Sequence, residues 1–439
     1  MGSKRKTKRL RIVHPDTAGI DIGKRKHYVA VDPGRCEQAV RNFGSFTSDL
    51  EALADWLEEC SVKIVAMEST GVYWIPLYEV LDRRGFEVHL VNPRATKHVS
   101  GRKSDVLDCE WIWQLMSYGL LRGAFRPPDA ICELRSYVRQ RNRLHNDTAR
   151  SIQHMQKALT EMNIQLDNVL SDITGQTGIA ILRAIVAGER DGTQPAKYRN
   201  YRVKADEATI ARALQGNWRD EHLFALEQAL ARFDFFRTQI DAIEQRIRAV
   251  LESLRANETD NAEVDRQCRR GDAVLQAALR EMMGVDLTAI PTIGVETALV
   301  IASEIGPDLS RFPTREHFCS WLTLAPGTRI SGDRKLSGAS PKRVNRVGQA
   351  LRMAAASARN NKTYIGAAHR ARLSRLDAAR ANKATAHQLA RLIYAMLTRG
   401  EEYVDRGIEI FEQYRREREI KNLQHRARRL GMMLIEDAA

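Results

Sequence analysis

The sequence of 439 residues lacks the paired metal ligands and the cysteine framework that define several protein classes. Its six cysteines stand at positions 36, 60, 109, 132, 268 and 319 and form no C-x-x-C pair, and its eleven histidines form no H-x-x-x-H pair. Zinc-binding modules and disulfide-stapled secreted domains both need such spacing. We therefore expect the cysteines to be buried or free thiols in a reducing compartment.

Long apolar segments are also missing. No window approaches the roughly 18 to 20 apolar residues that a transmembrane helix needs. The basic run at residues 4–11 is followed by "IVHPDTAGI", which lacks the apolar core of a signal peptide. No strongly apolar helix carries basic residues along one side, as a helix bound to an anionic membrane surface would. We expect a soluble cytoplasmic protein, associated with the nucleoid, that has no membrane partner.

Positive charge, by contrast, is in excess. The chain has 69 Lys and Arg against 55 Asp and Glu, a formal charge of +14 and a pI near 9.6. Much of the excess is local, at residues 4–11, around residue 101 and in "RRERE…HRARR" near the C-terminus. Such a balance is typical of proteins that bind a polyanion, of which nucleic acid is the commonest.

Residues 15–125, after a basic arm of residues 1–14, have the pattern of a mixed sheet with helices on its faces. Helical patterns run through Leu50, Leu53 and Leu57 and over residues 74–85. Short β-like runs cover residues 17–23, 26–32, 62–68 and 86–92. This order of elements fits a ribonuclease-H-like fold.

The rest of the chain is predicted to be mainly helical. Apolar residues recur near heptad spacing from Ile131 to Leu159 and from Leu226 to Leu254. These two stripes predict either an antiparallel coiled-coil arm that supports dimerisation or an ordinary helical bundle, with equal support. We assign residues 126–274 to this helical region, residues 275–405 to an α-helical C-terminal domain and residues 406–439 to a basic helical tail.

The C-terminal domain contains two segments suited to phosphate. "LTAIPTIGVETALVIASEIG", residues 287–306, has the pattern of a helix–hairpin–helix, in which a turn at Gly294 would expose backbone N–H groups to a phosphate oxygen. A tight helical turn without a ligand would look similar. Residues 322–348 are rich in Gly, Ser, Pro, Arg and Lys, a composition too polar for a core and too basic for an idle linker.

Four acidic residues predict a metal site. Asp105 and Asp108 share a helix face at spacing i, i+3, where like charges repel unless a cation lies between them. A solvated helix N-terminus is the competing explanation for an isolated D-x-x-D. Asp21 and Glu68 each end a β-like run, and strand ends are where sites form in such sheets.

Together these acids have the layout by which ribonuclease-H-like nucleases hold two Mg²⁺ ions for phosphoryl transfer, with Mn²⁺ as a substitute. Carboxylates suit Mg²⁺ because it prefers hard oxygen ligands. The basic neighbours Lys24, Arg102 and Lys103 would then dock the phosphates.

The residues around these acids carry a family resemblance. "GIDIGKRKHYVAV", "AMESTGVYW" and "VNPRATKHVSGRKSDVLD" resemble the N-terminal domain of the DEDD insertion-sequence transposases of the IS110 family. "IPTIGVETALVIASEIGPDLSRFPTREHFCSWLTLAPGTRISG" is similar to the C-terminal transposase domain of the same family. The resemblance implies an N-terminal domain like that of the Holliday-junction resolvase RuvC and an acidic tetrad formed by Asp21, Glu68, Asp105 and Asp108.

The resemblance also implies a nucleophile and partners. Ser331, in the S-G step after the L-A-P turn, would attack a DNA phosphate and form a covalent intermediate, assisted by carboxylate-bound metal. The partners implied are the element's DNA ends, its DNA target and a non-coding bridge RNA that guides the recombinase. The sequence departs from the family pattern at Ser104, Cys109 and Thr323, which stand where the family usually has Thr, Ala and Gly.

Two other functions stay open at this stage. A metal-dependent nuclease or junction resolvase would use the acids alone, with Ser331 as a loop serine beside Ser337 and Ser340; a nucleic-acid-binding scaffold would need neither. We favour the recombinase, acting as a homo-oligomer, either a dimer or a tetramer. Further phosphate contacts are expected from basic residues of the serine segment, namely Arg329, Arg334, Lys335, Lys342, Arg343 and Arg346.

Overall fold

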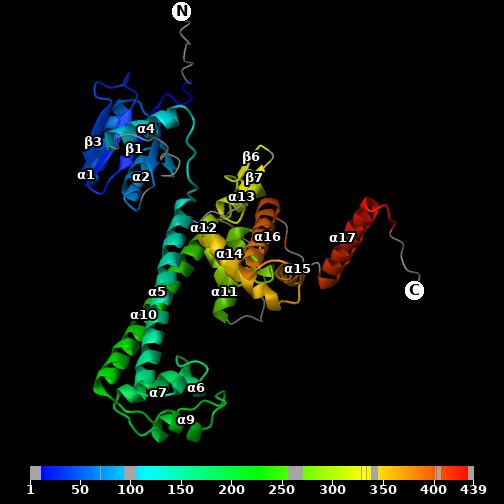
Figure 1. Ribbon diagram of the computed structural model, residues 1–439. Helices are drawn as coiled ribbons and strands as arrows, with labels where there is room; N and C mark the ends of the chain where they lie inside the picture. Colours follow the sequence, from blue (N-terminus) through cyan, green and yellow to red (C-terminus); the bar gives the residue numbers. More distant parts are fainter. Residues whose placement is uncertain are drawn as a thin grey trace, which may run out of the picture. The chain divides into compact units, whose positions relative to one another are not determined.

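The structure is a computed structural model that describes residues 11–69, 71–92, 105–255, 270–327, 329–332, 334–337, 345–400, 402 and 407–433. The chain divides into two units, Met1–Arg126 and Pro127–Ala439, and each is described by itself (Figure 1). Within the described ranges, every helix is too short or too polar to cross a lipid bilayer. Further subdivision of the second unit into separate domains stays a prediction.

The first unit is built on a five-stranded mixed sheet. Its strands are β1 (Thr17–Ile22), β2 (Lys26–Val31), β3 (Val40–Gly44), β4 (Ile64–Glu68) and β5 (Glu87–Val91), in the spatial order β3-β2-β1-β4-β5. β1, β2 and β3 pair antiparallel, whereas β4 runs parallel to both β1 and β5. The mixed α/β sheet predicted from the sequence is confirmed, and β3 occupies a segment whose state the sequence pattern left open.

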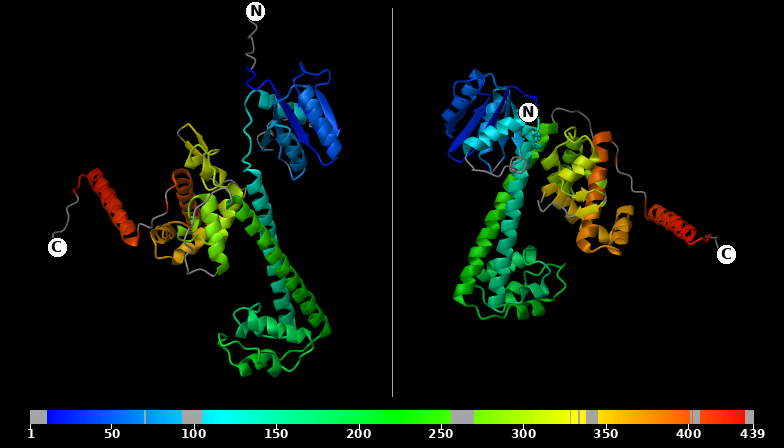
Figure 2. Two further views of the ribbon diagram at one scale, coloured as in Figure 1. Left: turned by 180° about the vertical axis from the view of Figure 1, so that it is seen from behind. Right: turned by 45° about the horizontal axis from the view of Figure 1, so that its top comes forward.

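Helices cover both faces of this sheet (Figures 1 and 2). One face, which includes Ile20 and Met67, packs against α1 (Thr47–Glu59) and α2 (Trp74–Arg83) in the larger core. The other face packs against α4 (Asp105–Ser117), whose Ile112 and Met116 are buried against Ala66. Because side chains alternate along a strand, β4 and β5 contribute to both cores, with Met67 and Leu90 in the larger one and Ala66 and Val91 in the smaller one.

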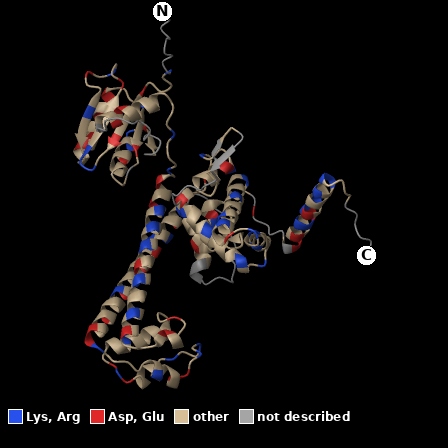
Figure 3. Cartoon of the chain, in the orientation of Figure 1, with Lys and Arg blue, Asp and Glu red and all other residues tan. Residues whose placement is uncertain are grey.

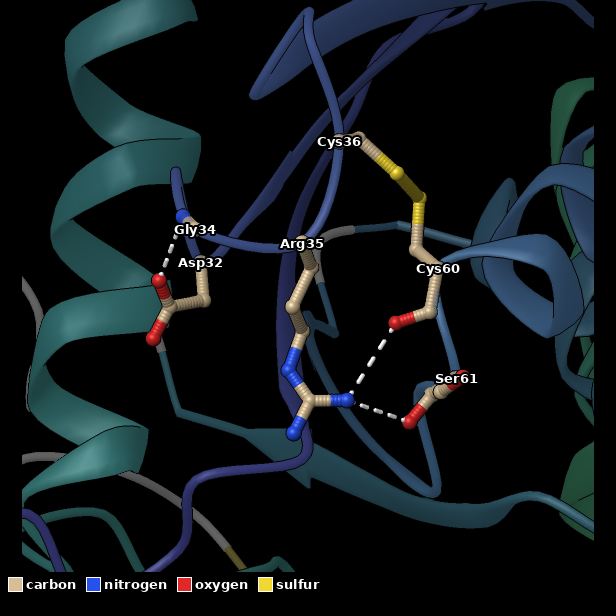
Figure 4. The surroundings of a disulfide bond; sticks show 6 residues. All are labelled: Asp32, Gly34, Arg35, Cys36, Cys60 and Ser61. Atoms are coloured by element: carbon tan, nitrogen blue, oxygen red, sulfur yellow. Dashed lines mark hydrogen bonds between the residues drawn. A yellow bond between two sulfur atoms is a disulfide. The ribbon is translucent and has the colours of Figure 1, made fainter.

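A disulfide joins Cys36, in the loop after β2, to Cys60, just after α1 (Figure 4). The prediction of unpaired thiols is therefore wrong for these two residues. They are 24 positions apart in sequence, a separation that carries no local signal, and the packing of the loop against α1 brings their Cα atoms to 6.0 Å. Arg35 reinforces the junction, because its Nη1 donates to the carbonyl oxygens of Cys60 and Ser61 at 3.2 and 2.7 Å.

The remaining cysteines of the described residues agree with the prediction. Cys109 and Cys319 are buried free thiols, and Cys132 is a half-buried free thiol. Burial raises the pKa of Cys109 to about 12 and that of Cys319 to about 11, so both thiols stay protonated near neutral pH. Cys268 lies outside the described residues.

The second unit is mainly helical, as predicted. Its elements are α5 (Asp129–Glu161), α6 (Leu166–Val169), α7 (Gln176–Val186), α8 (Thr193–Ala196), α9 (Glu207–Ala213), α10 (Asp220–Arg255), α11 (Arg270–Met283), η1 (Leu287–Ala289), α12 (Val295–Ile305), α13 (Arg315–Trp321), β6 (Arg329–Ser331), β7 (Arg334–Ser337), α14 (Arg346–Ser357), η2 (Ala358–Asn360), α15 (Tyr364–Leu373), α16 (Ala378–Arg399) and α17 (Gly407–Arg429). The two-stranded hairpin of β6 and β7 lies in the segment where the sequence indicated only a polar loop.

The two heptad-like stripes belong to α5 and α10, which lie side by side as an arm (Figures 1 and 2). Glu161 of α5 pairs with His222 of α10 at 3.2 Å, and Arg141 of α5 pairs with Glu244 of α10 at 2.9 Å. A later residue of one helix thus meets an earlier residue of the other, so the helices are antiparallel. Lys and Arg residues are distributed along both helices (Figure 3).

Buried charges fix this arm to the C-terminal helices. Arg141 is only 7% exposed, and its guanidinium donates to the carboxylates of Glu244 on α10 and Glu296 on α12. Close by, Arg139 donates through Nε and Nη2 to both carboxylate oxygens of buried Glu304, each at 2.7 Å. The hydrogen bond from Arg141 holds the pKa of Glu296 below its usual value. Removal of Arg141 would leave the carboxylates of Glu244 and Glu296 without the cation that pairs with them.

We predict that Arg141→Ala lowers the free energy of unfolding by about 1–3 kcal/mol. This is less than the ~3–5 kcal/mol lost when a fully buried pair is broken. The difference arises because Glu244 and Glu296 are 32% and 62% exposed, so water can solvate them. Urea denaturation would measure the change. Arg150→Ala is the control: Arg150 is 73% exposed and, among the residues that the structure describes, forms an ion pair with Asp147 alone, at i, i+3, so a change within about 0.5 kcal/mol is expected. Equal effects of the two substitutions would contradict the prediction.

Candidate active site

Asp21 and Glu68 lie at the carboxyl ends of neighbouring parallel strands. Ile20 of β1 is opposite Met67 of β4, and the next position on each strand is Asp21 and Glu68. Ile20 and Met67 face the core with α1 and α2. By the alternation of side chains, the two half-buried acids are on the other face of the sheet, which α4 covers.

The direction of α4 brings its first turn to the same end of the sheet. The backbone N–H groups of Val13 and His14, which precede β1, donate to the carbonyl oxygen of Ser117 at 2.8 and 3.0 Å. The C-terminal end of α4 therefore lies beside the start of β1. Its N-terminal turn, with Asp105 and Asp108, consequently lies toward the end of β1 where Asp21 stands.

Gly19 allows α4 to contact β1 directly. A Cβ atom at this position would lie 2.2 Å from the backbone nitrogen of Trp113 and 2.4 Å from the carbonyl oxygen of Cys109. Only the absence of a side chain permits so close an approach of helix and strand backbones. This contact sets the position of α4 on the face that carries Asp21 and Glu68.

Cys109, directly after Asp108, is fully buried between α4 and the sheet. Burial, together with smaller effects of the negative charges of Glu110 and Asp21, raises its pKa to about 12. The contact of the Cys109 carbonyl oxygen with Gly19 likewise places this turn of α4 near the end of β1 that carries Asp21. A neutral thiol at the position where the family usually has Ala adds no negative charge beside the acids.

The structure therefore places the strand ends that carry Asp21 and Glu68 and the first turn of α4 at the same end of one sheet. Asp108 is half-buried, and Asp105 is the first residue of α4, with its side chain outside the description. Within the described residues no three His, Cys, Asp or Glu side chains already form a metal-binding cluster. The donor set itself, hard carboxylate oxygens at a sheet edge, suits Mg²⁺. The assignment of these residues as metal ligands stays a prediction.

The basic residues predicted near the acids are only partly described. Lys24 is exposed in the β1–β2 turn, three residues after Asp21, and the turn is closed by a hydrogen bond from the N–H of Gly23 to the carbonyl oxygen of Lys26 at 3.1 Å. It can therefore reach a phosphate that approaches this end of the sheet. Arg102 and Lys103 lie outside the described residues.

Ser331 is in the second unit, at the tip of the β6–β7 hairpin. It is exposed and pairs with Arg334 across the turn. Gly332 follows with φ of +56°, at the turn position where both primed hairpin turns need positive φ. A glycine follows Ser331 because the turn needs positive φ at that position. Ser331 itself ends strand β6 instead of lying in a loop. Ser337 is at the far end of β7, paired with Arg329.

The other phosphate contacts predicted in this unit are described by the structure to different extents. Gly294 is the exposed N-cap of α12, and no side chain caps that helix. Arg346 begins α14, 3.8 Å from the carboxylate of Glu304. Arg329, Arg334 and Lys335 are described through their backbone in the hairpin, and Lys342, Arg343 and Ser340 lie outside the described residues.

Two family models match the chain at the segments just described. A DEDD-type transposase model of IS110 matches residues 18–164, and a model of the transposase family IS116/IS110/IS902 matches residues 284–370. Together they cover more than half of the 439 residues, in the order in which the two segments occur here. The chain belongs to this transposase family. No curated protein matches it.

Family membership makes this transposase a DNA-acting enzyme of insertion-sequence transposition and recombination. The first matched segment contains all four acids, and the second contains Gly294 and Ser331. What sequence reasoning missed is the support around the acids: Gly19, the direction of α4 and the neutral thiol of Cys109. The sequence signal for the close contact was Gly19 within the strand TAGIDI, because glycine inside a strand is typical of close backbone approach.

Thr323, where the family usually has Gly, adopts a strained conformation just after α13. Its φ is +60°, a region that β-branched residues rarely occupy. Its Oγ1 is also buried, with no hydrogen-bond partner among the described residues. Both features cost free energy, so this transposase tolerates here a residue that glycine would replace without strain.

We predict that Gly19→Ala destabilises the transposase by about 2 kcal/mol or more, because the new methyl group would overlap backbone atoms of α4 that cannot move independently. DNA strand cleavage should fall with it, since α4 carries Asp105 and Asp108. Urea denaturation and a cleavage assay would measure the two effects. Gly34→Ala is the control in the same unit: its Cβ would meet only a carboxylate oxygen of Asp32 at 3.3 Å, and a change within about 0.5 kcal/mol is expected. Unchanged stability of the Gly19→Ala protein would disprove the close contact.

We also predict that Thr323→Gly stabilises the transposase by about 1 kcal/mol, since relief of strain and of the unpaired hydroxyl exceeds the entropy lost by glycine on folding. Thr323→Ala removes the hydroxyl but keeps a Cβ at positive φ, so its gain should be smaller. The denaturant midpoints of the three proteins give the order. A destabilised glycine variant would show that Thr323 makes a contact that outweighs its strain.

Proposed function

We propose that this transposase cuts, exchanges and rejoins DNA strands through a covalent bond between Ser331 and a DNA phosphate, assisted by Mg²⁺ bound to its acidic tetrad. The observation that carries the proposal is the convergence of Asp21, Glu68 and the first turn of α4 on one end of the sheet. Acids so placed would repel one another without a cation. The exposed serine at a hairpin tip supplies a group that DNA can approach.

Asp21, Glu68, Asp105 and Asp108 would hold the metal, with Mn²⁺ as a substitute. When bound, the metal would stabilise negative charge on the phosphate and on the leaving oxygen. The protein contributes the rest. The sheet and α4 hold the acids in place before DNA arrives, the buried neutral thiol of Cys109 adds no competing charge, and Lys24 attracts the phosphate.

In the β6–β7 hairpin, Ser331 acts as the nucleophile. Its hydroxyl loses a proton, its oxygen forms a bond to phosphorus, and one P–O bond of the DNA backbone breaks to release a DNA hydroxyl. In the reverse step, a DNA hydroxyl attacks the phosphoserine and regenerates the serine. The bond energy is kept in the protein–DNA link, so strands rejoin without an external energy source. A free serine hydroxyl is a poor nucleophile, and it therefore needs activation by its surroundings.

The partners follow from the same proposal. We propose that a non-coding bridge RNA guides the enzyme to its DNA, that its N-terminal domain is RuvC-like and that it works at the nucleoid as a dimer or tetramer. Support comes from the resemblance of its motifs and from the net charge of +14, which suits two polyanions. Exchange between two duplexes also requires several active sites.

A metal-dependent nuclease without a covalent step is the second candidate. One observation favours it: the acids belong to the first unit alone, and a hydrolytic site at that sheet edge needs no residue from the hairpin. Such an enzyme would activate water and leave free DNA ends.

We predict that Ser331→Ala abolishes both recombination and the covalent adduct, because the attacking oxygen is gone. The measurement is a denaturing gel of protein trapped on labelled DNA that carries the element's ends, with its non-coding RNA present. Ser337→Ala, at the far end of the hairpin, is the matched control and should still form the adduct. Asp108→Asn and excess chelator should each prevent adduct formation while leaving DNA binding largely intact.

Three results would redirect this proposal. An adduct on the Ser331→Ala protein would mean that another residue is the nucleophile. Wild-type cleavage that leaves only free ends, equally in the Ser331→Ala protein, would establish the nuclease. Full activity in excess chelator would exclude a role for the acids as metal ligands.

A further inference from the structure

The tip of the arm contains a pocket that neither family model covers. Between α5 and α10, the helices α6 to α9 build a core of their own with the ends of the arm helices. The first family model ends at residue 164 and the second begins at residue 284, so the helices α6 to α9 lie outside both. The pocket has a volume of about 670 Å³, within the ~300–1,000 Å³ of small-molecule sites. It is lined by residues 169–172, by residues 175–178 at the start of α7 and by residues 200–204.

The loop beside this pocket interleaves basic and aromatic residues. Residues 197–204 read "KYRNYRVK", with four cationic side chains, two tyrosines and no acid. Tyr201 lines the pocket and is 78% exposed. The guanidinium of Arg202 lies 5.3 Å from the centre of the Tyr201 ring, and its Nε donates to the phenol oxygen at 2.9 Å. An aromatic ring this exposed contributes almost nothing to the core of the tip.

The loop is nevertheless held in one conformation. Arg199 donates to the carbonyl oxygens of Val203 and Ala205 at 2.8 and 2.6 Å, which closes the loop on itself. The Oγ1 of Thr177, in the first turn of α7, accepts from the N–H of Asn200 at 3.0 Å. These bonds hold the backbone of the loop that carries Tyr201 before any ligand arrives, which reduces the entropy lost on binding.

The charges of the pocket suit an anion at one side. Arg202 and Lys204 line it and are exposed, whereas Asp172 is the acid among the lining residues. The carboxylate of Asp172 is already used as a turn cap, because its Oδ1 accepts from the N–H and the hydroxyl of Thr174 at 2.8 and 2.7 Å. The balance of the lining is therefore positive, next to an aromatic face.

We propose that the arm tip binds an unpaired nucleotide of a nucleic-acid strand, with its base stacked on Tyr201 and its phosphate beside Arg202 and Lys204. Exposed aromatic rings flanked by cations are how proteins hold single strands, because every base has a face that can stack. A base inside a duplex is already stacked on both sides and cannot take this place. RNA and DNA single strands share this chemistry. The proposal does not depend on Ser331 or on the acidic tetrad.

Photochemical crosslinking tests this site in the full chain. Single strands that carry 5-iodouridine as RNA, or 5-iodo-2′-deoxyuridine as DNA, are irradiated with the protein, and the crosslinked peptide is identified by mass spectrometry. We expect a crosslink at Tyr201, because halogenated pyrimidines react with the aromatic ring on which they stack. The RNA and DNA strands show which of the two the tip binds, and a crosslink with either supports the proposal.

Matched variants locate the interaction. Tyr201→Ala should lose the crosslink and weaken single-strand binding by at least about fivefold, the lower end for one stacked base. Tyr201→Phe should keep most of the affinity. Tyr198→Ala is the control, because Tyr198 is 54% exposed in the same loop but does not line the pocket. The double variant Arg202→Ala, Lys204→Ala should weaken binding and its dependence on salt.

The results of this crosslinking experiment can be told apart from those that test the Ser331 mechanism. The Ser331→Ala protein should crosslink at Tyr201 as well as wild type does, so a failure of the recombinase mechanism would leave this result unchanged. No crosslink at the tip with either strand, or an equal crosslink with fully paired duplex, would overturn the proposal. Equal loss of affinity in the Tyr198→Ala and Tyr201→Ala proteins would overturn it too, since the pocket would then have no special role.

Discussion

The contact between the backbones of β1 and α4 at Gly19 is the constraint on which the acidic site depends. Asp21 and Glu68 are placed by the sheet, but Asp105 and Asp108 belong to a helix that follows a long connection from β5. That helix could take many positions on the sheet. The missing side chain at Gly19 lets it lie directly on the strand, and the bonds from Val13 and His14 to Ser117 fix its direction.

In the second unit, ion pairs between charged side chains hold the arm helices against α12. The arm helices and α12 meet through Arg139, Arg141, Glu296 and Glu304, where purely apolar residues would also have filled the space. Charged pairs of this kind contribute less net stability than their distances suggest, because each group must lose its water. Their directional bonds do define one arrangement of arm and α12.

Two residues of the second unit have features that cost stability, namely the backbone strain of Thr323 and the exposed ring of Tyr201. Thr323 lies just before the segment that leads to the hairpin, and its positive φ costs free energy that the surrounding helices must offset. Tyr201 exposes most of its ring at the arm tip, in a loop that hydrogen bonds hold firmly. In both places the fold keeps a feature that stability alone would remove. The tip adds the proposed single-strand contact beyond the segments shared with the family.

The sequence by itself determined the elements and the candidate residues. Alternation and helical periodicity located four of the five sheet strands and both arm helices, because these patterns depend on neighbours in the chain. The identities of the acids and of Ser331 came from motifs, which are also local. Tertiary structure decided the Cys36–Cys60 bond and the direction of α4. Each of these depends on groups far apart in sequence: two cysteines 24 residues apart, or Val13 and Ser117 at opposite ends of a unit. No local pattern encodes such a distance, because it exists only once the sheet and its helices have packed.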